Sequence, residues 1–328
     1  MVDELNLFQY FNLPFQIELI LGFITLAISA ELISISAEKL SVKFGQGFTG
    51  GIIIGLVTAL PETLFVIIAV LNNRDDVAIG SALGANVILF TFGIGMLGIL
   101  YTIKWRKQAE ISKEYKIEER YLLISNLALI IVYLVGFLNY LLSLAILIIY
   151  FSYVYERYKI YRSNIFSGNE EKDKNVKVGL KYFLMLTLGS LLIILSSEIF
   201  VEGLARASSL LDISAGLIAL IITPIASELE EKISSFRLVL RSPNNFTIAL
   251  LSFIGSKIEN MTLLIGLVGL LSNNDFIPVR DYSKEFISAI ITTFIALYVL
   301  IDRKIRFLES FLLVLSYFII IFILIYIK

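Results

Sequence analysis

Two glutamates, each with a hydroxyl residue one helical turn earlier, are the side chains of this chain best suited to chemistry. Glu62 lies in the segment TALPET and Glu231 in the segment SELEEK, and both segments stand within apolar runs. Thr58 and Ser227 precede the two acids by four residues, which puts a hydroxyl and a carboxylate on one helical face in each copy. Because a carboxylate inside a bilayer is costly and rarely kept without a function, we expect these residues to form a cation site.

Each acidic segment is followed by a run rich in small residues. The runs read SALGANVILFTFGIG (81–95) and SFIGSKIENMTLLIG (252–266), with serine, glycine and threonine at matching places. An earlier pair, Ser-Ala-Glu at 29–31 and Ser-Ser-Glu at 196–198, extends the similarity towards the beginning of each half. Matching segments in the same order predict an internal repeat, with the ion site at the interface of its two copies.

The second acidic segment can be aligned with the first in two registers. Matching Gly47 with Gly216 makes Glu231 the second acid of the site. Matching Gly50 with Gly216 makes it Glu228 instead. We favour Glu231, because the residues that follow it mirror the first copy better, and Glu228 remains the alternative.

The composition restricts both the class of protein and the kind of site. The chain has 328 residues, of which 58% are hydrophobic and 17% charged, and its mean hydropathy is +0.86. Soluble domains contain about 25% charged residues, so this chain is predicted to be a polytopic membrane protein. It contains no cysteine and no histidine, which excludes disulfides, thiolate or imidazole metal sites and cysteine nucleophiles. Carboxylate, hydroxyl, amide and carbonyl oxygens remain, and these are the ligands of hard cations.

Apolar stretches long enough to cross a bilayer recur along the chain. We predict ten spans, at 16–37, 47–71, 77–102, 121–137, 139–156, 181–203, 213–238, 246–271, 285–302 and 306–327. The expected fold is therefore all-α, with two five-helix repeats at 1–157 and 179–328 and a polar linker at 158–178. An odd number of spans in each repeat makes the two repeats inverted relative to each other.

Basic residues gather on one side of the predicted spans. Roughly twenty lysines and arginines fall on that side and about five on the other. The smaller group comprises Arg74, Arg206, Arg280, Lys284 and Lys328. Because cytoplasmic loops carry the excess of positive charge, the richer side is predicted to be cytoplasmic, and both termini are predicted to lie outside.

Two prolines interrupt the helices that carry the acids. Pro61 precedes Glu62 directly, and Pro224 stands seven residues before Glu231. Because proline lacks an N–H, each leaves a carbonyl one turn earlier without its helical donor. The carbonyl near Leu220 is the one expected to be freed in the second copy.

These motifs resemble the cation/Ca²⁺ antiporter superfamily of the sodium/calcium exchanger type. The resemblance covers nearly the whole chain and is carried by TALPET with GSALGAN, and in degraded form by SELEEK with IGSK. It implies ten spans in two inverted halves. It further implies that Glu62 and Glu231 are central cation ligands and that Thr58 and Ser227 flank them. Further polar ligands implied by the resemblance are Asn86, Ser256 and Asn260.

The chain also departs from the family's pattern. Ala59, Ala85 and Leu89 stand where that pattern offers polar residues, Glu230 replaces the second motif proline, and Lys257 replaces the second motif asparagine. A buried lysine that can lose its proton could substitute for a bound cation, which favours proton coupling or an unusual ion. The alternative is that Lys257 only neutralises a glutamate of another span.

The sequence therefore predicts a secondary active cation antiporter that exchanges Ca²⁺ for Na⁺ or H⁺ at a carboxylate site near the membrane midplane. A cation or proton channel, or an antiporter for another cation, is the alternative. We expect no enzymatic activity, no cofactor beyond the transported ions, and no nucleic-acid partner. The expected partners are inorganic cations and the lipid bilayer, in a multi-pass protein of the plasma membrane that can act as a monomer.

Overall fold

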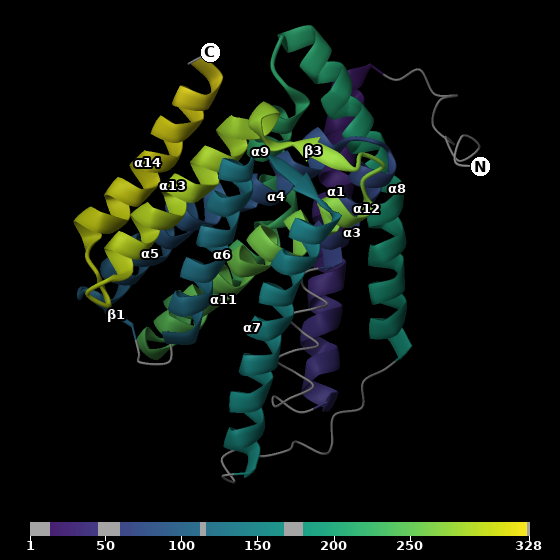
Figure 1. The fold of residues 1–328 in the computed structure, drawn as a ribbon. Helices are drawn as coiled ribbons and strands as arrows, with labels where there is room; N and C mark the ends of the chain where they lie inside the picture. The colour runs from purple at the N-terminus through teal and green to yellow at the C-terminus, as the bar shows by residue number, and fades with distance from the viewer. Residues whose placement is uncertain (1–13, 45–59, 112–115, 167–179, 327–328) are drawn as a thin grey trace.

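The computed structural model describes residues 14–44, 60–111, 116–166 and 180–326. Within these ranges the chain is a bundle of helices (Figure 1). The first half contains α1 (Phe15–Phe44), α3 (Leu60–Leu71), α4 (Asp75–Ile88), the π-helix η2 (Leu89–Gly93), α5 (Ile94–Trp105), α6 (Lys116–Val135) and α7 (Tyr140–Phe166). The second half contains α8 (Leu180–Leu211), α9 (Ala215–Ser227), α10 (Leu229–Arg241), η4 (Pro243–Asn245), α11 (Phe246–Glu259), the π-helix η5 (Asn260–Leu264), α12 (Ile265–Leu271), η6 (Val279–Tyr282), α13 (Ser283–Leu300) and α14 (Phe307–Tyr326).

Many of these helices are apolar and long enough to cross a membrane. Seven described segments meet that criterion by length and composition: 15–33, 75–105, 140–159, 180–211, 243–271, 279–300 and 307–326. The helices α3 and α9 are apolar but shorter. The predicted span at 213–238 is not continuous, because α9 ends at Ser227 and α10 begins at Leu229. The predicted span at 47–71 lies partly outside the described residues.

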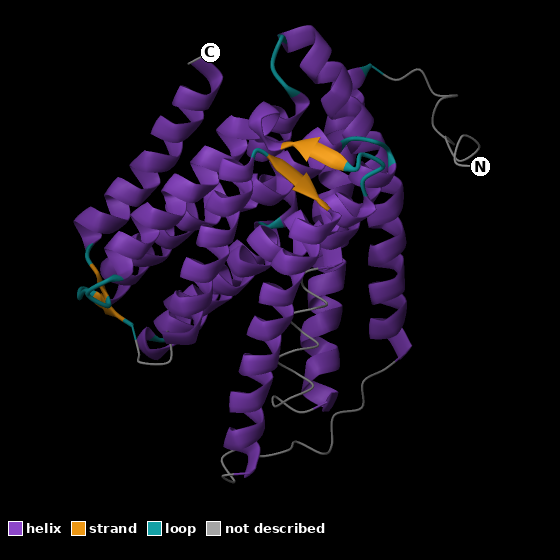
Figure 2. Cartoon of the chain, viewed as in Figure 1, coloured by secondary structure: helices purple, strands orange, loops and turns teal. Residues whose placement is uncertain are grey.

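Two small β-pairs, which the all-α prediction did not include, join loops of the two halves. Strand β1 (Ala109–Glu110) pairs antiparallel with β4 (Lys304–Ile305), and β2 (Phe137–Asn139) pairs antiparallel with β3 (Phe276–Pro278). Figure 2 shows the two pairs at opposite ends of the bundle. Each pair therefore ties a loop of the first half to a loop of the second half at the same end of the helices.

The two halves share unusual local structure at matching positions. The π-helices η2 and η5 interrupt the α4–α5 and α11–α12 rods. Thr91 in η2 donates its hydroxyl hydrogen to the Val87 carbonyl, and Thr262 in η5 donates to the Ile258 carbonyl. Since π-helical turns are rare and often mark functional sites, their occurrence at corresponding places indicates a shared design.

The helices α1 and α8 lie against each other along one side of the bundle (Figure 1). Glycines on both helices permit the close approach: a Cβ on Gly22 would lie 2.7 Å from Phe200 Cβ, and a Cβ on Gly189 would lie 2.8 Å from Ile33 Cγ1. The Arg206 guanidinium also forms an ion pair of 3.1 Å with Glu18 on α1. These contacts hold α1 and α8 together as a closely packed pair.

The helices α4 and α9 form a second close contact inside the bundle. A Cβ on Gly80 would lie 2.0 Å from the Gly216 carbonyl oxygen, and a Cβ on Gly84 would lie 2.1 Å from the Leu220 carbonyl oxygen. The Leu220 carbonyl, which Pro224 deprives of its helical donor, thus faces the backbone of α4. Glycine is required at these places because any side chain would collide with backbone.

Candidate functional site

Glu231 lies in the first turn of α10 and is held by two serines of α11. Its Oε1 accepts a hydrogen bond of 2.6 Å from Ser252 Oγ, and its Oε2 accepts one of 2.7 Å from Ser256 Oγ. The two serines are four residues apart on one helical face, which explains how both reach the same carboxylate. Of the two, the sequence comparison had named only Ser256 as a site residue.

Glu228 lies at the break between α9 and α10 and is almost completely buried, with 2% of its surface exposed. Its Oε1 accepts a hydrogen bond of 3.2 Å from Asn260 Nδ2, at the beginning of η5. Its Oε2 is buried and receives no hydrogen bond from any described residue. A buried carboxylate oxygen without a donor is costly, and a bound cation would satisfy it.

Glu62 brings a carboxylate from the first half to the same region. It lies in the first turn of α3 and is partly buried. Its carboxylate is in the electrostatic field of Glu228, Glu231 and Glu259. We call Glu62, Glu228, Glu231 and Glu259 the carboxylate cluster. Glu62 and Glu231, the two acids that the sequence analysis selected, therefore act on each other electrostatically.

Glu259 is a member of the cluster that sequence reasoning did not select. It is the last residue of α11 and has 9% of its surface exposed. Glu231 and Glu228 are the charged groups that act on its carboxylate. No motif marks it, since it stands between the two motif positions Lys257 and Asn260.

The cluster does not by itself form a complete metal centre. Among the described residues, no three acidic side chains converge closely enough to hold a metal ion together. Neutral oxygens of serine, asparagine or the main chain must therefore complete any cation site built on these acids. Ser227, the last residue of α9, is partly buried near the break, and Thr58 lies outside the described residues.

Lys232 places an ammonium group beside the carboxylates. It has 5% of its surface exposed, and its Nζ donates a hydrogen bond of 2.8 Å to the Pro224 carbonyl oxygen across the helix break. Glu228, Glu231 and Glu62 are the acids whose charges act on it. The sequence analysis did not select Lys232 as a site residue. The sequence signal that could have identified it is its position directly after Glu231.

Lys257 is fully buried, with 0% of its surface exposed, but its contacts differ from those of Lys232. Its Nζ donates a hydrogen bond of 3.1 Å to the Asn86 carbonyl oxygen and lies 4.1 Å from the centre of the Phe90 ring. A carbonyl and an aromatic face are both favourable partners for an ammonium group. The side-chain amide of Asn86 is also buried, and neither of its polar atoms has a hydrogen-bond partner among the described residues.

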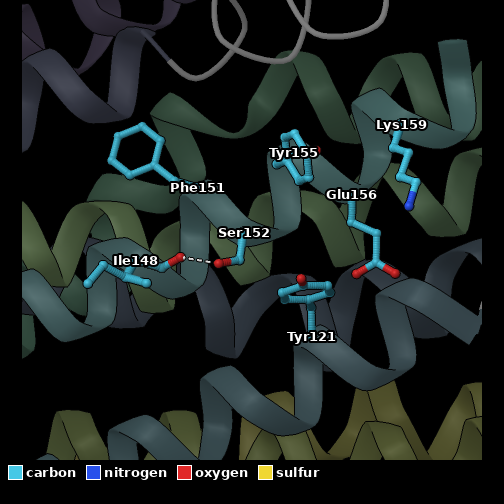
Figure 3. Close-up of a pocket in the computed structure, with 7 residues that line it drawn as sticks. All are labelled: Tyr121, Ile148, Phe151, Ser152, Tyr155, Glu156 and Lys159. Atoms are coloured by element: carbon cyan, nitrogen blue, oxygen red, sulfur yellow. Dashed lines mark hydrogen bonds between the residues drawn. The ribbon is translucent and has the colours of Figure 1, made fainter.

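A pocket of about 500 Å³ lies elsewhere, between α6 and α7. Figure 3 shows its lining, which includes Tyr121, Ser152, Glu156 and Lys159. The Ser152 hydroxyl donates a hydrogen bond of 2.7 Å to the Ile148 carbonyl oxygen, so its hydrogen is already engaged. None of the four clustered carboxylates lines this pocket, so it is separate from the candidate site.

Comparison with known proteins identifies the family. The family model described as "Sodium/calcium exchanger protein" matches residues 17–159 and 181–326. The chain belongs to this family. It is therefore a membrane protein of a cation-exchanging transporter family and not a member of an enzyme family.

Individual relatives are more distant than the family itself. The chain is 26% identical over 288 residues to the inner membrane protein YrbG of Escherichia coli (strain K12), covering 83% of this chain and 86% of the relative. Its fold is similar to that of the H⁺/Ca²⁺ exchanger CAX, with a TM-score of 0.77, 21% identity, and coverage of 97% of this chain and 86% of the other. It is also similar to the sodium–calcium exchanger NCX_Mj, with a TM-score of 0.60, 18% identity, and coverage of 95% and 97%.

Proposed function

We propose that this exchanger carries Ca²⁺ in one direction and Na⁺ or H⁺ in the other, and that the carboxylate cluster is its cation site. The observation that carries the proposal is the electrostatic influence on Glu62 in α3 of Glu228 and Glu231, which lie at the α9–α10 break. Buried or partly buried acids that act on one another inside a membrane bundle are rarely retained without a transport role. The similarity to solved H⁺/Ca²⁺ and sodium–calcium exchangers supports the same reading.

The proposed chemistry is competition for a limited set of oxygens. Glu62 and Glu231 supply the central charges. Ser256, which is hydrogen-bonded to Glu231, and Asn260, which is hydrogen-bonded to Glu228, supply neutral oxygens. A divalent ion and its monovalent counter-ions compete for the same carboxylates, because cations held close together at one site repel each other. Binding of one therefore displaces the other, and this displacement couples the two fluxes. Thr58, Ser227 and Asn86 remain proposed flanking ligands.

The domain arrangement proposed with this function is two inverted five-helix repeats, at 1–157 and 179–328, joined by the linker 158–178. The two separately matched family segments support this division. The first described turn of α1 and the last of α14 lie at the same end of the bundle (Figure 1), as an even number of spans requires. We place the loops rich in lysine and arginine in the cytoplasm and both termini outside.

Proton coupling is favoured over sodium coupling by the scarcity of neutral ligands. Ala85 and Leu89 are buried in the span 75–105, and neither supplies an oxygen from its side chain. Sodium requires several such oxygens, whereas a proton requires only a carboxylate. Lys257 is also buried, and its ammonium group donates to the Asn86 carbonyl oxygen, so a fixed cation lies beside one of the proposed flanking ligands.

Transport in sealed vesicles tests the proposal. The purified protein is reconstituted into liposomes, and uptake of radioactive Ca²⁺ is measured first under an imposed Na⁺ gradient and then under an imposed pH gradient. The proposal expects uptake that requires one of these gradients and that is lost in Glu231→Gln. Conduction of a single ion species without any counter-ion would instead identify a channel and overturn the proposal.

A further inference from the structure

The ammonium group of Lys232 has an arrangement that a packing role does not explain. It is buried, it belongs to the same helical turn as Glu231, and it reaches back across the break to the Pro224 carbonyl. That carbonyl already accepts a hydrogen bond of 3.3 Å from the Glu228 N–H. The lysine is therefore not needed to satisfy it, and burial of an ammonium group is costly unless nearby negative charge compensates for it.

The compensating charge comes from the proposed cation ligands themselves. Lys232 directly follows Glu231 in α10, and its N–H donates a hydrogen bond of 3.2 Å to the Glu228 carbonyl oxygen. The charges of Glu228, Glu231 and Glu62 act on its ammonium group from both halves of the chain. Each of these acids is thus partly neutralised before any transported ion arrives. An ammonium fixed near a cation site lowers the site's affinity for every cation, and it lowers it more for an ion of higher charge.

We propose that Lys232 is a tethered cation that sets the affinity and the charge selectivity of the carboxylate cluster by competing electrostatically with the transported ion. This inference rests on the proposed function, because it takes the cluster to be the cation site. Lys232 is a specificity-determining residue in this account and does not itself touch the transported ion. Its effect is to weaken the hold on Ca²⁺ more strongly than the hold on Na⁺.

Removal of the charge gives a quantitative signature. In Lys232→Met the apolar stem is kept, and the Pro224 carbonyl retains its bond from the Glu228 N–H. Because the interaction energy is proportional to ionic charge, the logarithm of the affinity gain for Ca²⁺ is twice that for Na⁺. If the substitution lowers the dissociation constant for Ca²⁺ by at least about tenfold, the dissociation constant for Na⁺ should therefore fall by about threefold.

The experiment measures both dissociation constants on purified full-length protein in lipid nanodiscs at one pH. Radioactive Ca²⁺ is titrated by equilibrium dialysis, and Na⁺ is titrated by its competition with Ca²⁺. Lys232→Arg keeps the positive charge and should remain within about threefold of wild type. Lys284→Met is the matched control, because Lys284 also donates to a main-chain carbonyl, that of Leu324 at 3.1 Å, but from α13. It should leave both constants unchanged.

The outcomes separate this inference from the proposed function. If wild type does not bind Ca²⁺, or if Glu231→Gln binds it as well as wild type, the proposed site is wrong. If Glu231→Gln loses binding but Lys232→Met binds Ca²⁺ no more tightly than wild type, only the tethered-cation inference is overturned. Weaker binding in Lys232→Met also overturns it, because a purely structural lysine would give that result. Equal tightening for Ca²⁺ and Na⁺ contradicts the charge mechanism.

Discussion

Two glycines at matching places of the two small-residue runs should respond differently to the same substitution. Gly84 and Gly255 occupy matching places in the two small-residue runs. A Cβ on Gly84 would lie 2.1 Å from the Leu220 carbonyl oxygen and 2.5 Å from its Cα, whereas a Cβ on Gly255 would meet only the Tyr153 hydroxyl, at 3.4 Å. Alanine at 84 therefore collides with backbone, and alanine at 255 makes an ordinary contact.

The size of the effect follows from these distances. Real Cβ atoms do not come within 3.0 Å of other heavy atoms, so α4 and α9 must separate locally until the 2.1 Å approach is relieved. Overpacking of this kind costs about 1–3 kcal/mol and sometimes more. Gly255→Ala avoids this cost and gains about 1 kcal/mol of helix propensity. Because α9 leads directly into the break at Glu228, the separation caused by Gly84→Ala should also displace that carboxylate.

Thermal unfolding in detergent and Ca²⁺ uptake into proteoliposomes test this prediction together. We expect Gly84→Ala to lower the melting temperature by at least about 3 °C and to reduce uptake. Gly255→Ala should melt at the wild-type temperature or a few degrees above it, and it should match wild type in uptake. Equal melting temperatures for wild type and Gly84→Ala would refute the close approach of α4 and α9. If both substitutions lowered the melting temperature and the uptake equally, the matching position in the sequence, and not the local contact of each glycine, would determine the effect of alanine.

Three further predictions concern the carboxylate cluster and Lys257. Glu62→Gln should abolish Ca²⁺ exchange in proteoliposomes without changing the elution volume of the protein, and retained exchange would remove Glu62 from the site. Glu231→Gln should reduce exchange more than Glu228→Gln, because it disturbs two serine contacts and a central charge; the reverse order in the same assay would favour the other register. Lys257→Asn should change which counter-ion gradient drives uptake, and an unchanged preference would assign Lys257 a structural role.

The acids themselves could be found from the sequence because intramembrane carboxylates are rare. Glu62 and Glu231 were identified by their apolar surroundings and their repeated context, and the structure places both in one electrostatic neighbourhood. The sequence offered Glu228 as an alternative to Glu231. The structure places both Glu228 and Glu231 in the carboxylate cluster, because the helix breaks at Glu228 and α10 begins directly after it. A choice that depends on helical register cannot anticipate a break in the helix.

Other parts of the site have no sequence signal of their own. Glu259 enters the cluster only because α11 packs beside α10, a tertiary contact that no spacing rule gives. The π-helices coincide with the repeated threonines Thr91 and Thr262, but a threonine in an apolar run does not predict a π-turn. The β-pairs are two or three residues long, too short to show an alternating pattern.

The glycine contacts between α1 and α8 have a mechanical consequence. Phe200 fits over Gly22 while Ile33 fits over Gly189, so each helix provides both a protruding side chain and the recess that receives its partner's. Neither helix can slide along the other unless Phe200 and Ile33 leave their contacts with Gly22 and Gly189 at the same time. If these helices move relative to the rest of the bundle, α1 and α8 should therefore move together as one unit. The sliding contact would then lie between this pair and the neighbouring helices.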